Sequence, residues 1–431
     1  MKYFGTDGIR GIPNKKLTIE LVTRLGMALK SLDINDVIIA CDTRVSKDML
    51  AFGLASGALS RGLTVHFAGV MPTPALIYNS HLKKCIGIMI TASHNPYTDN
   101  GIKVLNKGIK LTEDEELMIE SLIDNPADYN GEIGKLIFDN EAKDRYLEFI
   151  NSKNVKSSLK VCIDCANGAT STTAPLIFNN VTNKLVICAN EPDGYNINNG
   201  VGSTHLDYLK QHVLDNKCDI GFAFDGDGDR VLCVNKDGKI IDGDMLIFIL
   251  AKYLKLNNKL NQNKVVLTIM SNLGLIDNLR QSGIEVVETN VGDKYVVREL
   301  LGNNLSVGGE NSGHIIMPQE LHTGDGVLVA LMILKVLEET NTTIDDWLKD
   351  VEMYSDSLVN IRVEDRNRVM NNDKLFNRIE EIKKELNNDC KIIVRASGTE
   401  DLIRVTVMAK TEELVKKYSN ELVSIVKESQ I

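Results

Sequence analysis

One short stretch of the chain places three chemically useful side chains on consecutive residues. Thr91-Ala92-Ser93-His94-Asn95-Pro96 offers a hydroxyl, an imidazole and an amide, directly after the apolar residues 85–90. The apolar run is typical of a short buried strand, and Pro96 ends any regular element, so the stretch is predicted to be a tight polar loop. A strand that delivers a serine onto such a loop suits a nucleophile or a phosphoryl acceptor. An ordinary turn rich in Ser, Asn and Pro is the alternative.

A second stretch suggests a metal site, because Asp225, Asp227 and Asp229 alternate with glycines. In an extended segment these carboxylates would point to one side, where they repel one another unless a cation lies among them. Oxygen ligands favour magnesium or calcium. A calcium-binding EF-hand loop needs Gly at its sixth position and Glu at its twelfth, but Arg230 and Lys236 stand there. Magnesium is therefore the favoured ion, and an acidic surface turn is the alternative.

Three further stretches could bind a phosphosugar. Arg10 lies between Gly8 and Gly11, which let the backbone approach a ligand, although a structural salt bridge is the alternative role. Residues 309–314, Gly-Glu-Asn-Ser-Gly-His, offer donors and acceptors suited to sugar hydroxyls. Residues 395–399, Arg-Ala-Ser-Gly-Thr, combine a guanidinium, two hydroxyls and a glycine, which suits phosphate oxygens.

Length and composition are those of a multidomain globular chain. With 431 residues, three or four domains are expected, and 43% hydrophobic and 25% charged residues are ordinary values. A net charge of −10 without a basic run argues against a nucleic-acid partner. The eight cysteines show no regular framework, so buried reduced thiols are expected, including the pair Cys162 and Cys165.

Neither a leader nor a membrane span is recognised. The residues after Met1 lack an apolar segment, and the longest apolar stretch, residues 327–334, is too short to cross a bilayer. We therefore expect a cytoplasmic protein without a membrane partner.

An internal repeat organises most of the chain. Apolar strands at 37–42, 160–164 and 265–270 are each followed by a second strand, at 64–67, 185–188 and 285–288, and by a third, at 86–90, 219–224 and 305–307. The third strands lead into the loops 91–96, 225–230 and 309–314, and a fourth strand returns from each loop. Strands that alternate with helical segments predict α/β units, in which ligands gather at the carboxyl ends of strands. The three loops are therefore expected to surround one cleft.

The pattern changes near residue 355, where a smaller α+β arrangement begins. The predicted fold class is α/β: three similar α/β domains with mixed sheets plus a smaller C-terminal α+β domain around a central cleft. The predicted domains are 1–150 with the serine loop, 151–250 with the metal site, 251–354 for sugar binding and 355–431 for phosphate binding.

Five motifs in this order resemble the α-D-phosphohexomutase superfamily. They are GTDGIRG at 5–11, TASHNP at 91–96, DGDGDR at 225–230, GENSGH at 309–314 and RASGTE at 395–400. The resemblance covers the chain from end to end. The opening KYFGTDGIRG and the segment 291–296 are most similar to the bacterial members that act on glucosamine phosphates.

The resemblance implies roles for individual residues. It makes Ser93 a phosphoserine that binds one Mg²⁺ per chain together with Asp225, Asp227 and Asp229, and it makes His94, Lys103 and Arg10 catalytic candidates. The residues that it implies in substrate binding are Arg230, Asp293, Lys294, Glu310, Ser312, His314, Arg395, Ser397, Gly398, Thr399 and Arg404. This chain departs from the family at Lys294, where arginine is commoner, and at Ala396 and Asp401, where proline is usual.

The implied reaction interconverts glucosamine 6-phosphate and glucosamine 1-phosphate through a bisphosphorylated sugar, with a bisphosphorylated hexose as activator. It would feed UDP-N-acetylglucosamine and cell-wall precursor synthesis, and the resemblance allows a homodimer. A phosphomannomutase/phosphoglucomutase of the same superfamily, a metal-dependent sugar phosphatase and a non-enzymatic phosphosugar-binding protein remain alternatives. The sequence contains no Walker A loop, G-x-G-x-x-G or G-x-S-x-G, which argues against nucleotide, dinucleotide and α/β-hydrolase chemistry.

Overall fold

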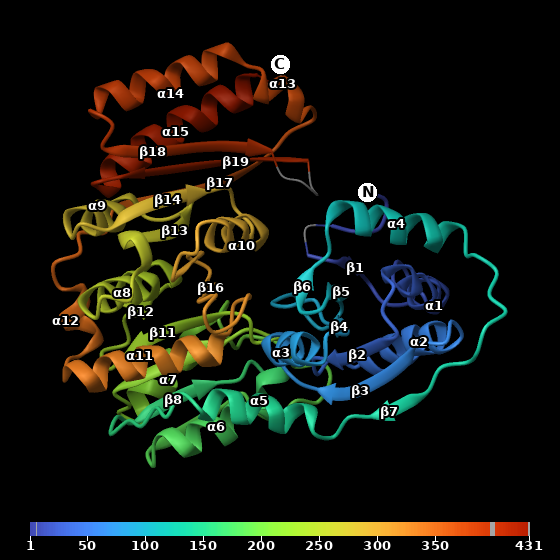
Figure 1. Cartoon of the computed structure of the whole chain (residues 1–431). Coiled ribbons are helices and arrows are strands. Elements are labelled where there is room, and N and C mark those ends of the chain that lie inside the picture. Colours follow the sequence, from blue (N-terminus) through green and yellow to red (C-terminus); the bar gives the residue numbers. More distant parts are fainter. Residues whose placement is uncertain (6, 397–400, 430–431) are drawn as a thin grey trace. The chain divides into compact units, whose positions relative to one another are not determined.

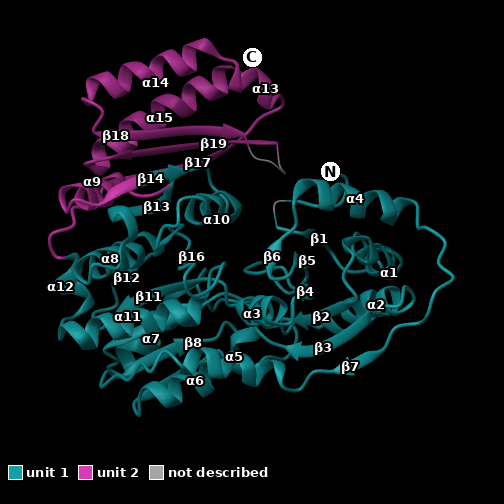
Figure 2. Cartoon of the chain, in the orientation of Figure 1, with its two compact units in different colours: residues 1–269, 287–348 teal, residues 270–286, 349–431 magenta. Residues whose placement is uncertain are grey.

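The computed structural model describes the whole chain except residues 6, 397–400 and 430–431. The chain divides into two compact units, which Figure 2 colours separately. Unit 1 comprises residues 1–269 and 287–348, and unit 2 comprises residues 270–286 and 349–431.

Unit 1 begins with a mixed sheet (Figure 1). Within the described residues this sheet has seven strands: β1 Ile9–Gly11, β2 Asp36–Cys41, β3 Thr64–Val70, β4 Ile86–Ile90, β5 Asn100–Asn106, β6 Ile109–Lys110 and β7 Leu136–Phe138. Their order is β1-β5-β4-β2-β3-β7, with β6 paired to β5. The strands β4, β2, β3 and β7 run parallel, whereas β5 is antiparallel to β4 and to β1.

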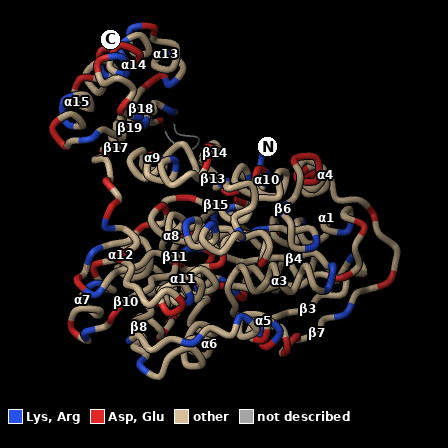
Figure 3. The backbone as a smooth tube through the Cα atoms, turned by 60° about the vertical axis from the view of Figure 1, so that its left-hand side comes forward, with Lys and Arg blue, Asp and Glu red and all other residues tan. Residues whose placement is uncertain are grey.

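Helices accompany this sheet: α1 Ile19–Ala28, α2 Lys47–Leu59, α3 Thr73–Lys83 and α4 Glu113–Asp124, with a short 3-10 helix η1 at Leu29–Leu32. The beginning of α4 follows from its sequence, because Thr112 and Glu115 form a capping box. Figure 3 shows the acidic first turn of α4 in red. Acidic side chains are favourable there because the N-terminus is the positive end of the helix dipole.

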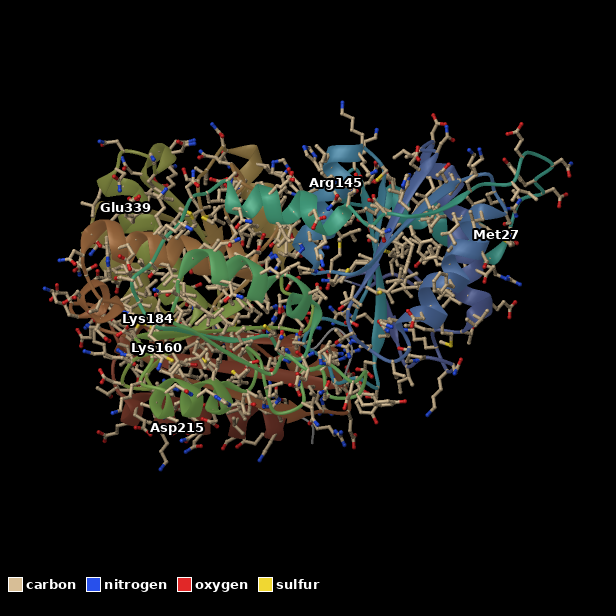
Figure 4. The ribbon with its side chains drawn as sticks, turned by 90° about the horizontal axis from the view of Figure 1, so that it is seen from below. Met27, Arg145, Lys160, Lys184, Asp215 and Glu339 are labelled. Carbon is tan, nitrogen blue, oxygen red and sulfur yellow. The ribbon has the colours of Figure 1, made fainter. Side chains whose placement is uncertain are left out.

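The second sheet has its strands in the order β12-β11-β10-β8-β9. The strands are β8 Val161–Asp164, β9 Leu185–Cys188, β10 Ile220–Phe224, β11 Val231–Asn235 and β12 Ile240–Ile241, and the accompanying helices are α5 Ala142–Asn151, η2 Ala169–Thr172, α6 Ala174–Val181 and α7 Leu206–Asp215. Strand β10 is parallel to β8 but antiparallel to β11. Lys160 and Lys184, both labelled in Figure 4, precede β8 and β9 and so mark the amino ends of these strands.

The third sheet has the order β14-β13-β15-β16. Its strands are β13 Lys264–Thr268, β14 Glu285–Thr289, β15 Gly308–Gly309 and β16 Ile315–Ile316, and the helices of this region are α8 Gly243–Leu256, η3 Asn261–Asn263, α9 Leu273–Gln281, α10 Asp293–Gly302, α11 Gly326–Thr340 and α12 Ile344–Leu348. Ten of the fifteen residues of α11 are buried, as its apolar sequence predicts.

Unit 2 contains an antiparallel sheet in the order β17-β19-β18. Its strands are β17 Ser355–Arg362, β18 Cys390–Ala396 and β19 Leu402–Ala409, and its helices include α13 Arg366–Met370, α14 Asp373–Glu385 and α15 Glu412–Glu428. Apolar residues of all three strands and of α14 and α15 form one core. Acidic and basic residues alternate along α14 and α15 (Figure 3).

The observed sheets confirm the predicted α/β fold class, three α/β domains followed by a smaller C-terminal α+β domain, but the third repeat differs from its prediction. The predicted strand 305–307 is displaced to Gly308–Gly309, and the returning strand, predicted at residues 314–317, shortens to Ile315–Ile316. The eight cysteines are free and buried, as expected. The domain boundaries at 150, 250 and 354 remain a prediction, since the division into two units follows other limits.

No helix among the described residues is both long enough and apolar enough to span a membrane.

Candidate active site

Ser93 lies in a loop at the carboxyl end of β4, as the sequence predicts. Its side chain is buried, and its backbone has a left-handed conformation with φ +52°. The Ser93 N–H donates to Thr91 Oγ1 over 2.9 Å. The Ser93 hydroxyl donates to Asp225 Oδ2 over 2.7 Å, although Asp225 is 132 residues away in the chain. The structure therefore brings the serine loop to the aspartate loop.

The three aspartates follow β10 and converge, with one carboxylate oxygen from each lying within 4.8 Å of the others. They do so on a turn and not on the extended segment that the sequence suggested, because Gly228 adopts a left-handed φ of +74°. Gly226 lets this turn approach the serine loop, since a Cβ there would lie 2.6 Å from the Ser93 carbonyl oxygen.

The aspartates differ in electrostatic environment. Burial raises the pKa of Asp225 well above its ordinary value, and the charges of Asp229 and Asp227 raise it further. Burial alone would also raise the pKa of Asp229, but Lys103 and His314 hold it well below the ordinary value. Asp227 Oδ1 and Asp229 Oδ1 are buried and accept no hydrogen bond from any residue that the structure describes. These two carboxylate oxygens are therefore able to coordinate a cation.

Lys103 lies on β5 and is the main positive charge among the aspartates. Its Nζ is 2.8 Å from Asp227 Oδ2, 3.2 Å from Asp229 Oδ2 and 3.2 Å from Asp7 Oδ2. Burial lowers the pKa of Lys103, but these carboxylates outweigh burial and raise it well above its ordinary value. Lys103 is therefore charged at neutral pH.

His94 lies beside the serine, with its Nδ1 3.4 Å from Ser93 Oγ. Burial lowers the pKa of His94 to about 4, and the neighbouring Arg230 and Arg10 contribute in the same direction. The imidazole is therefore neutral near pH 7 and able to accept a proton.

Arg10 and Arg230 add positive charge to the site. Arg10 forms an ion pair with Asp7, 2.6 Å long, so the structural role weighed for it is present. Arg230 Nε lies 3.8 Å from Asp229 Oδ1. The buried Nε atoms of both arginines donate no hydrogen bond within the described chain, which leaves each a donor for a ligand.

The loop between β15 and β16 reaches the same site. His314 is buried, with Nδ1 3.7 Å from Asp229 Oδ1 and Nε2 4.0 Å from Asp293 Oδ2. Glu310 Oε1 accepts a hydrogen bond from Gly292 N over 2.9 Å, and Ser312 Oγ lies 3.5 Å from Glu310 Oε2. The structure thus brings Glu310, Ser312 and His314 to the residues around Asp293.

Asp293 and Lys294 begin α10 and line a cavity of about 670 Å³. Asp293 Oδ2 is 2.6 Å from Lys110 Nζ, and Lys110 Nζ is also 2.9 Å from Asp7 Oδ1. Lys294 Nζ lies over the ring of Tyr295, 5.1 Å from its centroid. Lys110 therefore connects the first motif of the chain to the Asp293 loop.

The remaining predicted residues belong to unit 2. Arg395 on β18 and Arg404 on β19 are direct partners across the antiparallel pair. Ser397, Gly398 and Thr399 lie outside the described residues. Asp401, which stands where the family usually has proline, lies 3.7 Å from Arg366 Nε.

Four residues at the site were missed from the sequence: Arg44, Thr73, Lys110 and Asn198. Thr73 Oγ1 donates to Asp227 Oδ2 over 2.6 Å, and Arg44 and Asn198 both donate to the Ser93 carbonyl oxygen. One available signal was the placement of Asp42-Thr43-Arg44 directly after a buried strand, because ligand sites of α/β sheets lie at strand carboxyl ends.

Comparison with known sequences identifies the family. Four profiles described as phosphoglucomutase/phosphomannomutase match the chain: alpha/beta/alpha domain I at residues 1–130, domain II at 144–238, domain III at 242–354 and the C-terminal domain at 358–425. The chain therefore belongs to the phosphoglucomutase/phosphomannomutase family and is an isomerase of the phosphohexomutase class.

Two curated relatives match this chain over nearly its whole length. The phosphoglucosamine mutase of Bacillus licheniformis is 40% identical over 99% of this chain and 98% of its own length. That of Bacillus cytotoxicus is 41% identical with the same coverage.

Solved structures share the fold at lower identity. A phosphoglucomutase/phosphomannomutase family protein from Burkholderia thailandensis matches with a TM-score of 0.83 and 22% identity, covering 98% of this chain and 97% of that one. Aspergillus fumigatus N-acetylphosphoglucosamine mutase, in complex with GlcNAc-6P and magnesium, matches with a TM-score of 0.69 and 16% identity, covering 100% of this chain and 96% of that one.

Proposed function

We propose that this chain interconverts glucosamine 6-phosphate and glucosamine 1-phosphate, with Ser93 as the phosphoryl carrier. The observation that carries the chemistry is the 2.7 Å hydrogen bond from Ser93 Oγ to Asp225, within a buried cluster of three carboxylates. The glucosamine substrate is supported by the relatives that are about 40% identical over nearly the whole chain. A cytoplasmic location fits such an activity.

Charge balance supports a divalent cation at the aspartates. A phosphorylated Ser93 would bring about −1.5 to −2 charges to three carboxylates. Among the basic residues that the structure describes, Lys103 is the one that contacts two of these carboxylates within 3.2 Å. Oxygen-only donors and the orphan atoms Asp227 Oδ1 and Asp229 Oδ1 fit magnesium. Asp225, Asp227, Asp229 and phospho-Ser93 would hold the ion, which would withdraw charge from the phosphoryl oxygens.

The reaction proposed for these residues conserves the phosphoryl group. The Ser93 Oγ–P bond breaks as a sugar hydroxyl oxygen bonds to the same phosphorus. The proton that this hydroxyl loses ends on Ser93 Oγ, so the products are a bisphosphorylated sugar and a free Ser93 hydroxyl. The other phosphoryl group of that intermediate then returns to Ser93. A bisphosphorylated hexose from solution would load Ser93 initially and so act as the activator.

Three side chains serve this transfer in distinct ways. Neutral His94, 3.4 Å from Ser93 Oγ, can accept the proton that the attacking hydroxyl loses. Charged Lys103 offsets the negative charge around the transferring group. Arg10 and Arg230 can donate their free Nε–H groups to phosphate oxygens.

A turnover assay with Ser93→Ala tests the proposal. The wild type is expected to convert glucosamine 6-phosphate faster than glucose or mannose 6-phosphate, and its intact mass should show a phosphate adduct on Ser93. The variant should lose turnover by about three orders of magnitude or more, because the covalent carrier is gone. Near-normal turnover in a folded Ser93→Ala enzyme would refute the carrier role, and a preference for mannose or glucose would refute the assigned sugar.

A further inference from the structure

Arg44 is a buried cation at the centre of the Ser93 loop. It follows β2, its side chain has no exposed surface, and its Nε lies 2.9 Å from Oδ2 of the equally buried Asp42. A guanidinium at this depth is costly unless its donors are satisfied, and it has five N–H groups to satisfy. All five find acceptors here.

Four of these donors contact backbone carbonyls of one short loop. Arg44 Nη2 donates to Ser93 O over 2.9 Å and to Asn95 O over 2.8 Å. Arg44 Nη1 donates to Asp99 O over 3.2 Å and to Pro96 O. The fifth donor, Nε, binds Asp42. One planar group therefore sets the direction of four carbonyls between residues 93 and 99.

Asp42 ties the preceding part of the loop to the same guanidinium. Its Oδ2 accepts a hydrogen bond from Thr91 Oγ1 over 2.7 Å, and Thr91 Oγ1 accepts one from Ser93 N over 2.9 Å. Both backbone polar groups of Ser93, its N–H and its C=O, are thus held by the Asp42–Arg44 pair or its direct partner.

Asn198 holds two of the same carbonyls from the other side. Its Nδ2 donates to Ser93 O over 2.9 Å and to Asn95 O over 3.0 Å. Each of these carbonyl oxygens consequently receives two donors, one from a guanidinium and one from an amide. Because Asn198 lies between β9 and α7, it links the serine loop to the second sheet.

The conformation that this network holds is one that serine avoids. The left-handed conformation is disfavoured for a residue with a Cβ, because the Cβ comes too close to the following carbonyl oxygen. Ser93 has φ +52°, and in that conformation its Oγ reaches Asp225 Oδ2 at 2.7 Å. Without the hydrogen bonds to its carbonyl and N–H groups, the backbone of Ser93 would leave the left-handed conformation, and Oγ would no longer point at Asp225 Oδ2.

We propose that Arg44 is a positioning residue for phosphoryl transfer, which holds Ser93 in the backbone conformation that aims Oγ at the aspartate cluster. Arg44 acts through the loop and not through the sugar, so it governs the transfer step and not substrate affinity. The inference rests on the proposed function of Ser93. Lysine cannot replace Arg44, because an ammonium has three donors and no planar fork.

Arg44→Lys is the primary test. It retains the charge that balances Asp42 but cannot reach four carbonyls at once. The value of kcat should fall about 10- to 100-fold, since a misplacement of about 1 Å can cost that much. KM for both sugar phosphates should stay within about twofold, because Arg44 contacts the serine loop and not the substrate, so its loss affects the transfer step and not binding.

Arg145→Lys is a matched control. Arg145, labelled in Figure 4, lies on α5 and donates to Asn79 Oδ1 over 2.7 Å and to Asp139 Oδ2 over 2.6 Å, and neither partner belongs to the serine loop. The Arg145→Lys enzyme should be less stable than the wild type, with little change in kcat. The phosphorus NMR signal of phospho-Ser93 should shift in Arg44→Lys and not in Arg145→Lys, and a role confined to stability would not produce that difference.

A binding measurement separates positioning from affinity. In the Ser93→Ala background, calorimetric Kd values for glucosamine 6-phosphate should be equal with and without Arg44→Lys. If Arg44→Lys does not fold, Asn198→Ala replaces it, because it removes one donor from each of two carbonyls; kcat should then fall about 3- to 10-fold at constant KM.

Two results would overturn the inference: wild-type kcat in a folded Arg44→Lys enzyme, or a loss of kcat matched by an equal loss of affinity. If Arg44→Lys fails to fold, a wild-type kcat in the Asn198→Ala enzyme would overturn the inference instead. Failure of the proposed function is distinguishable, because the wild type itself would then show no phosphosugar turnover.

Discussion

Tyr146 and Asp325 form a buried pair whose effect on stability can be tested by pH. Asp325 caps the N-terminus of α11, where it accepts a hydrogen bond from Leu328 N over 3.0 Å. Tyr146 on α5 donates its hydroxyl to the same carboxylate, 2.9 Å from Oδ2. Burial raises the pKa of Asp325 from 3.8 to about 6, and the hydrogen bonds only partly oppose this rise.

The sign of the effect follows from which state binds the proton. Between about pH 4 and pH 6 the folded chain holds a proton on Asp325 that the unfolded chain has released. Stability therefore falls as the pH rises through this window. A shift of about two units at 1.36 kcal/mol each amounts to roughly 3 kcal/mol in full, of which about 2 kcal/mol should develop between pH 4.5 and pH 7.

Asp325→Asn removes this titration and preserves the shape of the pair. The amide oxygen can still accept from Tyr146 and from Leu328 N, and no charge is buried at any pH. Relative to the wild type, the free energy of unfolding of the variant should rise by about 2 kcal/mol between pH 4.5 and pH 7. Other titrating groups are common to both proteins and cancel in the difference.

The single tryptophan provides the assay. Trp347 lies on α12 in unit 1, the unit that contains the pair, so its fluorescence reports the urea unfolding of that unit. Tyr146→Phe is the control, since it leaves the carboxylate but removes its hydroxyl partner, and its loss of stability with pH should be steeper than that of the wild type. A difference between Asp325→Asn and the wild type that stays constant from pH 4.5 to pH 7 would refute the reasoning.

Three further predictions concern the reaction. Chelation should abolish turnover and added magnesium restore it, and Asp227→Asn should raise the magnesium concentration needed for half-maximal activity; full activity after exhaustive chelation would contradict the metal assignment. With glucosamine 6-phosphate, the 1-phosphate should accumulate far faster than inorganic phosphate, because a mutase must keep water from its intermediate; dominant phosphate release would favour a phosphatase. Arg395→Ala should raise KM steeply for both sugar phosphates and Arg395→Lys should do so less, because Arg395 is expected to grip the phosphate that is not being transferred; unchanged KM values in both directions would place that phosphate elsewhere.

Local patterns in the sequence determine the elements and the first members of the site. The apolar residues 86–90 and the polar loop after them are consecutive, so a strand that delivers Ser93 is visible without the fold. The same holds for the helix α4, whose capping box is read from Thr112 and Glu115. Asp225, Asp227 and Asp229 are two residues apart, so their convergence is predictable, although the turn that achieves it is not.

Only the tertiary structure decides which distant groups hold these residues in place. It also decides which of the titratable side chains of the site are protonated. Arg44 and Asn198 bind the Ser93 carbonyl oxygen across 49 and 105 residues. The position of Arg44 after a strand hints at a site, but nothing in the sequence links either residue to Ser93. Lys110 is one lysine in a short hairpin until folding places it between Asp7 and Asp293. Neutral His94 and charged Lys103 also depend on folding, because burial and the nearby charges that set their pKa values come from segments far apart in the chain.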